Sequence, residues 1–143
     1  MSLVFEDKIS STYRSAFVSK ITSISAKLGI DPNWLMVVMK NESGLKSNIE
    51  NSIGCVGLIQ FCPDKARGSY KTLGGKKVNL QSLKNISAVS QLEYVYMYYK
   101  SFAYKMNSVY DVYLATFYPY AIGKKDSYVF GSERSDSWAR KVG

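Results

Sequence analysis

Residues 31–44 read DPNWLMVVMKNESG, and this stretch predicts a short helix that ends in a glutamate. Asp31 is a favourable N-cap, and the proline that follows it suits the first helical position. Gly44 is a favourable left-handed stop. Glu42 therefore lies in the last turn of the predicted helix.

Glu42 shares one face of that helix with Leu35 and Val38. A carboxylate on an apolar face is costly unless it is paired or protonated. Burial and the negative end of the helix dipole both disfavour its charged form, so we expect its pKa to be raised. Such a carboxylic acid can donate a proton near neutral pH. The alternative is a surface glutamate at a frayed helix end.

The remaining periodicity predicts a mostly α chain that folds as a single domain over residues 1–143. Residues 86–106 are apolar around much of the helical circumference, so we expect this helix at the centre of the fold. The glycine-rich segment 46–85 predicts loops, with a short helix over 56–61 and another after Pro63. Residues 71–80 form either a small hairpin or a flexible loop. Further helices are expected over 6–28, 109–117 and 132–143.

The chain has 143 residues, 46% of them hydrophobic, and a formal net charge of +8. These values predict a proper core and exclude a largely disordered chain. A basic surface favours polyanions such as nucleic acid, acidic lipid or bacterial wall polymers, or serves solubility alone. No recognisable nucleic-acid module is present, so we expect no nucleic-acid partner. We find neither an apolar run of membrane-spanning length nor a signal peptide.

The chain has no histidine and two cysteines, Cys55 and Cys62. The missing histidine removes histidine-based triads and the common zinc sites, and two thiols alone make a poor metal site. We therefore expect no metal and no cofactor. Two cysteines do not make a disulfide framework, so we expect both to be free, buried thiols.

Two motifs, Glu42-Ser43-Gly44 and Gly57-Leu58-Ile59-Gln60, resemble those of the soluble-type lytic transglycosylase domain. That family usually carries Glu-Ser-Gly, a loop and Gly-Leu-Met-Gln, commonly followed by a proline and an alanine. This chain has Pro63 and Ala66 in those places, and Gly54 in the loop. The family belongs to the lysozyme-like fold and is related to goose-type lysozyme, so the resemblance implies a lysozyme-like domain.

A third family motif, Ala-Tyr-Asn-Ala-Gly, has a looser counterpart in residues 115–123, which read ATFYPYAIG. Tyr118 matches the family's tyrosine, whereas Pro119 stands where asparagine is usual and the spacing to the glycine is longer. The resemblance covers about residues 31–123.

The resemblance implies cleavage of the MurNAc–GlcNAc β-1,4 bond of peptidoglycan, with Glu42 as acid and then base. The 6-hydroxyl of the sugar attacks, which leaves a 1,6-anhydro-MurNAc end. Ser43, Gly57, Gln60 and Tyr118 are the implied substrate-binding residues. Such an enzyme acts at the bacterial cell wall, as a monomer or as part of a larger chain or machine.

A hydrolytic enzyme of the goose lysozyme type would need a second carboxylate. Glu50, Asp64, Glu93 and Asp111 lie outside the motifs, and we interpret them as solvated or helix-end charges, which favours the one-carboxylate mechanism. The alternatives are hydrolysis by a goose-type-like muramidase and a non-catalytic wall-binding domain that keeps the fold.

Overall fold

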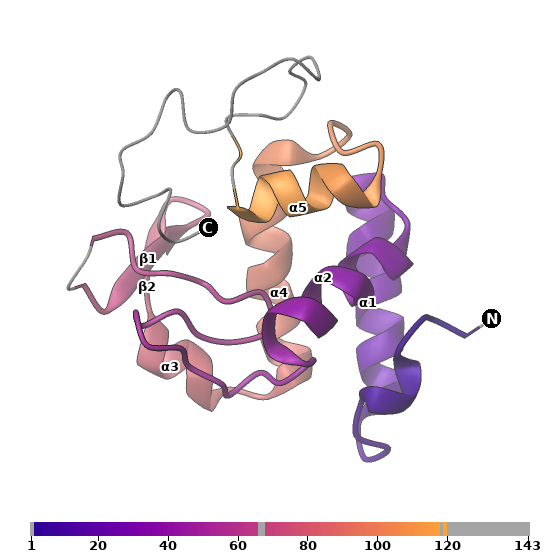
Figure 1. Cartoon of the computed structure of the whole chain (residues 1–143), viewed down its shortest axis with the longest axis horizontal. Helices are drawn as coiled ribbons and strands as arrows, with labels where there is room; N and C mark the ends of the chain where they lie inside the picture. The colour runs from indigo at the N-terminus through magenta and orange to yellow at the C-terminus, as the bar shows by residue number, and fades with distance from the viewer. Residues whose placement is uncertain (1, 66–67, 118, 120–143) are drawn as a thin grey trace.

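The computed structural model describes residues 2–65, 68–117 and 119, which form a helical body with one two-stranded hairpin (Figure 1). The predicted mostly α architecture is confirmed. The helix expected over 132–143 lies outside the described residues. No helix in the described part of the chain is long and apolar enough to cross a membrane. The elements, in order, are η1 (Glu6–Lys8), α1 (Arg14–Leu28), α2 (Pro32–Ser43), β1 (Tyr70–Leu73), β2 (Lys76–Asn79), α3 (Leu80–Asn85), α4 (Ala88–Tyr99), η2 (Lys100–Phe102) and α5 (Val109–Phe117).

Helix α2 begins and ends as its sequence predicts. The Asp31 carboxylate accepts a hydrogen bond of 2.8 Å from the Asn33 amide and so caps the helix. Gly44 ends the helix in the left-handed conformation, with φ of 65°. Glu42 is therefore held in the last turn of a helix with both ends capped.

The first predicted helix, over 6–28, is interrupted in the structure. Only η1 forms before Ile9, which is extended, and α1 begins at Arg14. The Ile9 side chain is buried, and its carbonyl accepts two hydrogen bonds from the Arg14 guanidinium, at 2.8 and 3.1 Å. These bonds satisfy the carbonyl outside a helix, which explains why the helix does not continue through this turn.

The predicted helix over 86–106 is shorter than expected. Helix α4 begins after Ser87, whose hydroxyl accepts a hydrogen bond of 3.1 Å from the Ser90 amide as an N-cap. It passes into η2, and the chain then turns at Tyr104, where φ is 62° and the amide donates to the Leu28 carbonyl at 2.9 Å. Met106 thus lies beyond the helix, although its side chain is buried in the core.

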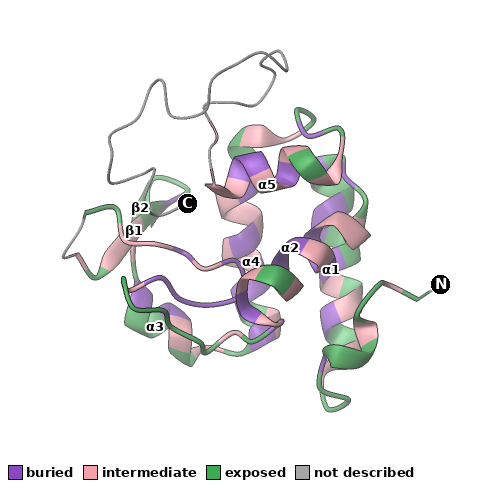
Figure 2. Cartoon of the chain, viewed as in Figure 1, coloured by how far each residue is buried: buried purple, intermediate pink, exposed green. Residues whose placement is uncertain are grey.

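Four of the α helices supply most of the buried core, which α1, α2, α4 and α5 line from different sides (Figure 2). Helix α4 contacts α1 and β1, and α2 contacts both α1 and α5. The fully buried residues of the core include Ile21 and Ile24 of α1, Leu35, Met36, Val38 and Met39 of α2, Leu92, Val95 and Tyr99 of α4, and Val112 and Ala115 of α5.

The glycine-rich segment contains one confirmed and two wrong predictions. Strands β1 and β2 pair antiparallel from Tyr70↔Asn79 to Leu73↔Lys76, so residues 71–80 are not a flexible loop. Gly74 and Gly75 both have positive φ, as a tight two-residue hairpin turn requires. Residues 56–61 form no helix, and neither do the described residues between Pro63 and β1.

Residues 56–61 instead form a closed turn. The amides and carbonyls of Val56 and Phe61 exchange two hydrogen bonds, at 2.9 and 2.7 Å. Gly57 and Gln60 both have positive φ, at 83° and 57°. Two left-handed residues in six are incompatible with a right-handed helix, which explains the failed prediction. We call residues 55–62 the motif loop.

Candidate active site

Glu42 lies at the C-terminal end of α2, with its side chain partly exposed. Its negative charge acts on the buried hydroxyl of Tyr99 from α4. Burial raises the pKa of Tyr99 well above its ordinary value, and the charges of Tyr98, Glu42 and Tyr113 add to this shift. Glu42 therefore lies within electrostatic range of Tyr99 of α4.

Helix α5 is fixed to α2 and α4 by tyrosine hydroxyls. The Asn41 amide donates a hydrogen bond to the Tyr113 hydroxyl. The Thr116 hydroxyl donates to the Val112 carbonyl at 2.7 Å, so in its 2.6 Å contact with Tyr99 the tyrosine is the donor.

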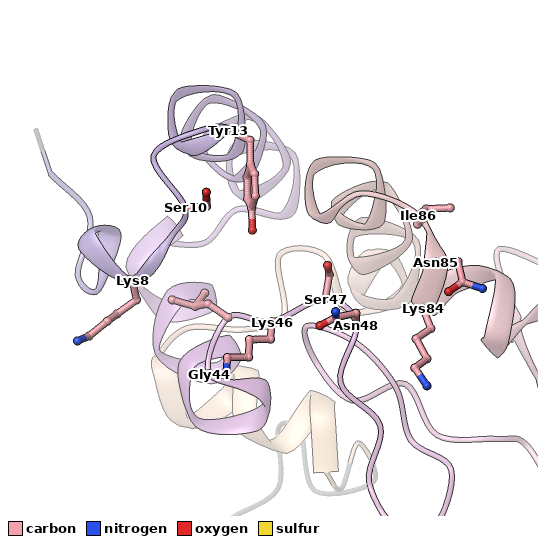
Figure 3. A pocket seen from close by; sticks show the side chains of 11 residues that line it. Lys8, Ser10, Tyr13, Gly44, Lys46, Ser47, Asn48, Lys84, Asn85 and Ile86 are labelled. Carbon is pink, nitrogen blue, oxygen red and sulfur yellow. The ribbon is translucent and has the colours of Figure 1, made fainter.

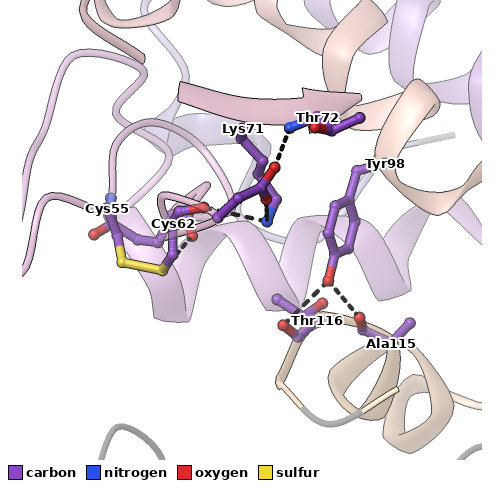
Figure 4. Close-up of polar contacts among 9 residues, drawn as sticks. Cys55, Cys62, Lys71, Thr72, Tyr98, Ala115 and Thr116 are labelled. Carbon is purple, nitrogen blue, oxygen red and sulfur yellow. Dashed lines mark hydrogen bonds and ion pairs between the residues drawn. A yellow bond between two sulfur atoms is a disulfide. The ribbon is translucent and has the colours of Figure 1, made fainter. Parts of the chain in front are cut away.

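Tyr98 anchors the end of the same helix. Its hydroxyl donates to the Ala115 carbonyl at 2.6 Å, and burial raises the pKa of Tyr98 to about 12 (Figure 4). Tyr118, the predicted late substrate contact, lies outside the described residues. The anchored end of α5 at Phe117 is the last described position before it.

The motif loop is joined to α2 next to Glu42 through Ser43. The Ser43 side chain is buried, and its hydroxyl contacts two carbonyls, Leu58 at 2.8 Å and Met39 at 3.1 Å. The Leu58 amide donates to Oε1 of Gln91 at 2.7 Å. Both backbone groups of Leu58 are thus held by side chains, one from α2 and one from α4.

Gln91 is a fully buried amide that the sequence reasoning missed. Besides the Leu58 amide, it binds the carbonyls of Ser47 and Leu83, each at 2.9 Å from its Nε2. All three bonds hold backbone from segments distant in sequence. The only available signal was a glutamine at a core position of a strongly apolar helix.

Gly57 is required by this arrangement. A Cβ at that position would lie 2.5 Å from Oε1 of Gln91, and the residue has φ of 83°. The Gly57 carbonyl accepts from the backbone amide and from Nε2 of Gln60, both at 3.0 Å. Gln60 is only partly buried, so its side chain lies at the surface of the loop.

Cys55 and Cys62 form a disulfide across the base of the motif loop (Figure 4). The expectation of two free thiols is wrong. The backbone pairing of Val56 with Phe61 explains the bond, because it places the two flanking cysteines side by side on adjacent chain segments. Their separation of seven residues in sequence does not reveal this proximity, which depends on the unpredicted turn.

Lys71 of β1 brings a cation to the motif loop. Its Nζ donates to the Cys62 carbonyl at 3.2 Å, lies 3.6 Å from Oδ1 of Asp64 and stands 5.7 Å from the centre of the Tyr98 ring. Burial lowers the pKa of Lys71, and the charge of Asp64 opposes this shift. No sequence motif marks Lys71.

Two cavities adjoin this group and share Lys71 and Tyr98. A small cavity of about 40 Å³ is lined by Ile59, Gln60, Phe61, Cys62, Lys71, Tyr98 and Thr116. A wider one of about 730 Å³ lies between the hairpin and the α4–η2 segment, and Pro119 contributes to it. The wider cavity, between the hairpin and the α4–η2 segment, has the volume of an ordinary ligand pocket.

The other four carboxylates considered from the sequence each have a partner close in space. Glu50 contacts Lys84 at 3.1 Å, and Glu93 contacts Lys20 at 2.6 Å. Hydrogen bonds lower the pKa of both, chiefly that from Gln81 to Glu50 and that from Lys20 to Glu93. Asp64 accepts from the Thr72 amide at 2.8 Å, and Asp111 from the Asn107 amide at 2.8 Å.

In the described part of the chain, no three His, Cys, Asp or Glu side chains are grouped so that they could hold a metal ion. The geometry thus combines a carboxylate at a helix end, a loop held by side-chain hydrogen bonds and a tyrosine-rich wall.

The family model described as Transglycosylase SLT domain matches residues 19–133 of the chain. The search of solved structures found none that matches this chain.

Proposed function

Because the chain belongs to the transglycosylase SLT family, we propose that Glu42 is the acid and base with which it cleaves peptidoglycan. At the level of the family, the activity is that of a peptidoglycan lytic transglycosylase. The observation that carries the assignment is the joining of Glu42 to the motif loop. Ser43, the next residue, bonds the Leu58 carbonyl at 2.8 Å, so acid and loop share one rigid support.

The proposed bond is the β-1,4 linkage between MurNAc and GlcNAc. Glu42 gives its proton to the leaving glycosidic oxygen, and the C1–O bond breaks to leave an oxocarbenium-like centre. The acetamido group of the same sugar stabilises that centre. The carboxylate of Glu42 then takes the proton of the 6-hydroxyl, whose oxygen bonds to C1 and closes a 1,6-anhydro ring.

The position of Glu42 supports its proposed role as an acid. The carboxylate lies in the last turn of α2, where the helix dipole disfavours its charge. This effect favours the protonated acid that the first step needs.

Non-hydrolytic cleavage is favoured over hydrolysis by the placement of the other carboxylates. Glu50 and Glu93 contact lysines, and Asp64 and Asp111 accept hydrogen bonds from backbone amides. Hydrolysis with a second general base would need a further carboxylate on the far face of the sugar.

The remaining site residues take distinct roles in this proposal. Gln60 and Gly57 present an amide and close backbone to the sugar, and Tyr118 contributes its hydroxyl from the segment after α5. Ser43 acts as a positioning residue, since its buried hydroxyl contacts the loop carbonyl. Residues 1–143 act together as a single catalytic domain at the bacterial cell wall.

The test is digestion of purified peptidoglycan by the wild type and by Glu42→Gln. Loss of the acid should lower the rate by at least about 100-fold, in line with the usual contribution of a general acid. Glu93→Gln, which removes an ion pair on a different helix, is the matched control and should keep activity. Mass analysis separates the outcomes, because a product heavier by one water identifies a hydrolase. A wild type that binds but never cuts identifies a wall-binding domain.

A further inference from the structure

A second concave site lies where η1, the end of α2 and the end of α3 meet. Its volume is about 570 Å³, within the range of ordinary ligand pockets. The lining residues are Lys8, Ser10, Tyr13, Gly44, Leu45, Lys46, Ser47, Asn48, Lys84, Asn85 and Ile86. We call it the Tyr13 pocket. It shares no residue with the cavities beside the motif loop.

The centre of the Tyr13 pocket offers neutral hydrogen-bonding groups. Figure 3 shows the hydroxyls of Tyr13 and Ser47 directed into the opening from different segments, with the Asn48 amide beside them. None of these three side chains makes a hydrogen bond to another described residue. They are therefore available to a ligand, and hydroxyls and amides are the groups that bind polyhydroxylated molecules.

The rim of the pocket is cationic. Lys8, Lys46 and Lys84 line it, and Figure 3 shows the ammonium groups of Lys8 and Lys84 directed away from the centre. Lys84 contacts Glu50 at 3.1 Å, whereas Lys8 and Lys46 form no ion pair with any described residue. Positive groups that point outward fit a ligand whose charges continue beyond the pocket, as in a polymer.

The pocket wall is rigid. The Ser47 carbonyl is bound at 2.9 Å by the buried Gln91, and the Leu45 amide is bound to the Met39 carbonyl at 3.2 Å. Tyr13 packs against Phe17, with ring centres 6.3 Å apart. A preformed wall loses little freedom when a ligand binds.

We infer that the Tyr13 pocket binds one unit of a polyhydroxylated, negatively charged polymer and so holds the wall at a second point. The unit fills the neutral centre, and anionic groups on its neighbours meet Lys8 and Lys46. The charge comes either from carboxylates of the glycan and its peptides or from phosphates of a polymer attached to the wall. Nucleic acid fits less well, because the pocket offers one aromatic ring and no series of rings on which successive bases could stack.

The test uses binding to insoluble sacculi in the Glu42→Gln background, so that the polymer is not cut. The pocket variant combines Tyr13→Phe, Lys46→Gln and Ser47→Ala. A control variant makes the same kinds of change at exposed positions outside the pocket, Tyr110→Phe, Lys105→Gln and Ser52→Ala. Each is measured on intact sacculi and on sacculi stripped of phosphate polymers with hydrofluoric acid.

The pocket variant should bind about tenfold more weakly than the control, because two hydrogen bonds and one charge contact are lost. A loss on intact sacculi alone identifies phosphate, and an equal loss on stripped sacculi identifies carboxylate. Lys46→Arg should keep binding, which separates lost charge from misfolding. Equal binding of pocket and control variants to both materials overturns the inference, as does equal loss of binding to a DNA duplex.

Turnover of a soluble glycan and binding to sacculi together distinguish a failure of this inference from a failure of the proposed function. In the Glu42-containing protein, the pocket variant should turn over a short soluble glycan at the wild-type rate, because its substitutions lie outside the reacting groups. A wild type without lytic activity whose binding still depends on Tyr13, Lys46 and Ser47 would refute the proposed chemistry and keep the pocket.

Discussion

Substitution of Gly57 by alanine tests the central packing of the motif loop. The new Cβ would lie 2.5 Å from Oε1 of Gln91, 2.9 Å from its Cδ and 3.0 Å from its Nε2. The Gln91 amide is fully buried and holds three backbone groups, so it has no free space into which to move without breaking bonds. The loop must shift, or the amide must leave its partners.

Two costs add in Gly57→Ala. An alanine at φ of 83° is strained by roughly 1–2 kcal/mol relative to glycine. Displacing Gln91 from even one or two buried partners adds about 1–3 kcal/mol for each group left unsatisfied. We therefore expect a loss of about 4 kcal/mol in the free energy of unfolding, a large share of the roughly 5–15 kcal/mol typical of a domain.

Urea unfolding followed by circular dichroism measures this loss, and the chain offers a matched control. Gly44 also has positive φ, at 65°, but a Cβ there meets nothing within 4 Å. Gly44→Ala should therefore cost only the backbone strain, about 1–2 kcal/mol. Equal costs for the two alanine variants would refute the steric argument.

A second background isolates the clash. In Gln91→Ala the opposing amide is absent, so the added cost of Gly57→Ala should fall to about that of Gly44→Ala. A cost of Gly57→Ala that does not depend on residue 91 would show that Gln91 does not hold the loop as described.

Three further predictions follow from the site. Replacing Cys55 and Cys62 together by alanine should lower the free energy of unfolding by about 2 kcal/mol, as expected for a loop of this length, and reductant should mimic the change in the wild type but leave the variant unaffected. Ser43→Ala should lower the free energy of unfolding by about 1–2 kcal/mol and slow turnover, whereas the exposed Ser52→Ala should do neither; unchanged turnover in Ser43→Ala would refute the positioning role. Burial lowers the pKa of Lys71 in the folded state, so the unfolded chain binds more protons at alkaline pH. The stability of the wild type relative to Lys71→Met should therefore rise with pH up to the ordinary lysine value near 10.5, and a flat difference would contradict the half-buried position of Lys71.

The sequence was sufficient for the parts of the site that local chemistry determines. Asp31 and Gly44 define both ends of α2 by capping alone, which places Glu42 in the last turn. The pair Gly74-Gly75 suggested a hairpin without excluding a flexible loop, and positive φ at both residues matches the strand twist. These features depend on neighbours within a few residues.

The features that sequence reasoning missed depend on contacts that no local sequence pattern revealed. Gln91 reaches Leu58 and Ser47 across 33 and 44 residues, and no local pattern distinguishes it from an ordinary core position. The Cys55–Cys62 bond depends on the turn between Val56 and Phe61, where a short helix had been predicted. Lys71 reaches the Cys62 carbonyl only because the hairpin folds back on the loop.

The bond between the Leu58 amide and Gln91 also has a consequence for the order of folding. The turn between Val56 and Phe61 is closed by its own backbone hydrogen bonds, whereas the Leu58 amide donates to the Gln91 side chain of α4. Its rate of exchange with deuterium therefore reports the docking of α4, since it depends on a side chain 33 residues away. One amide resonance thus follows the assembly of the loop on which the proposed substrate contacts lie.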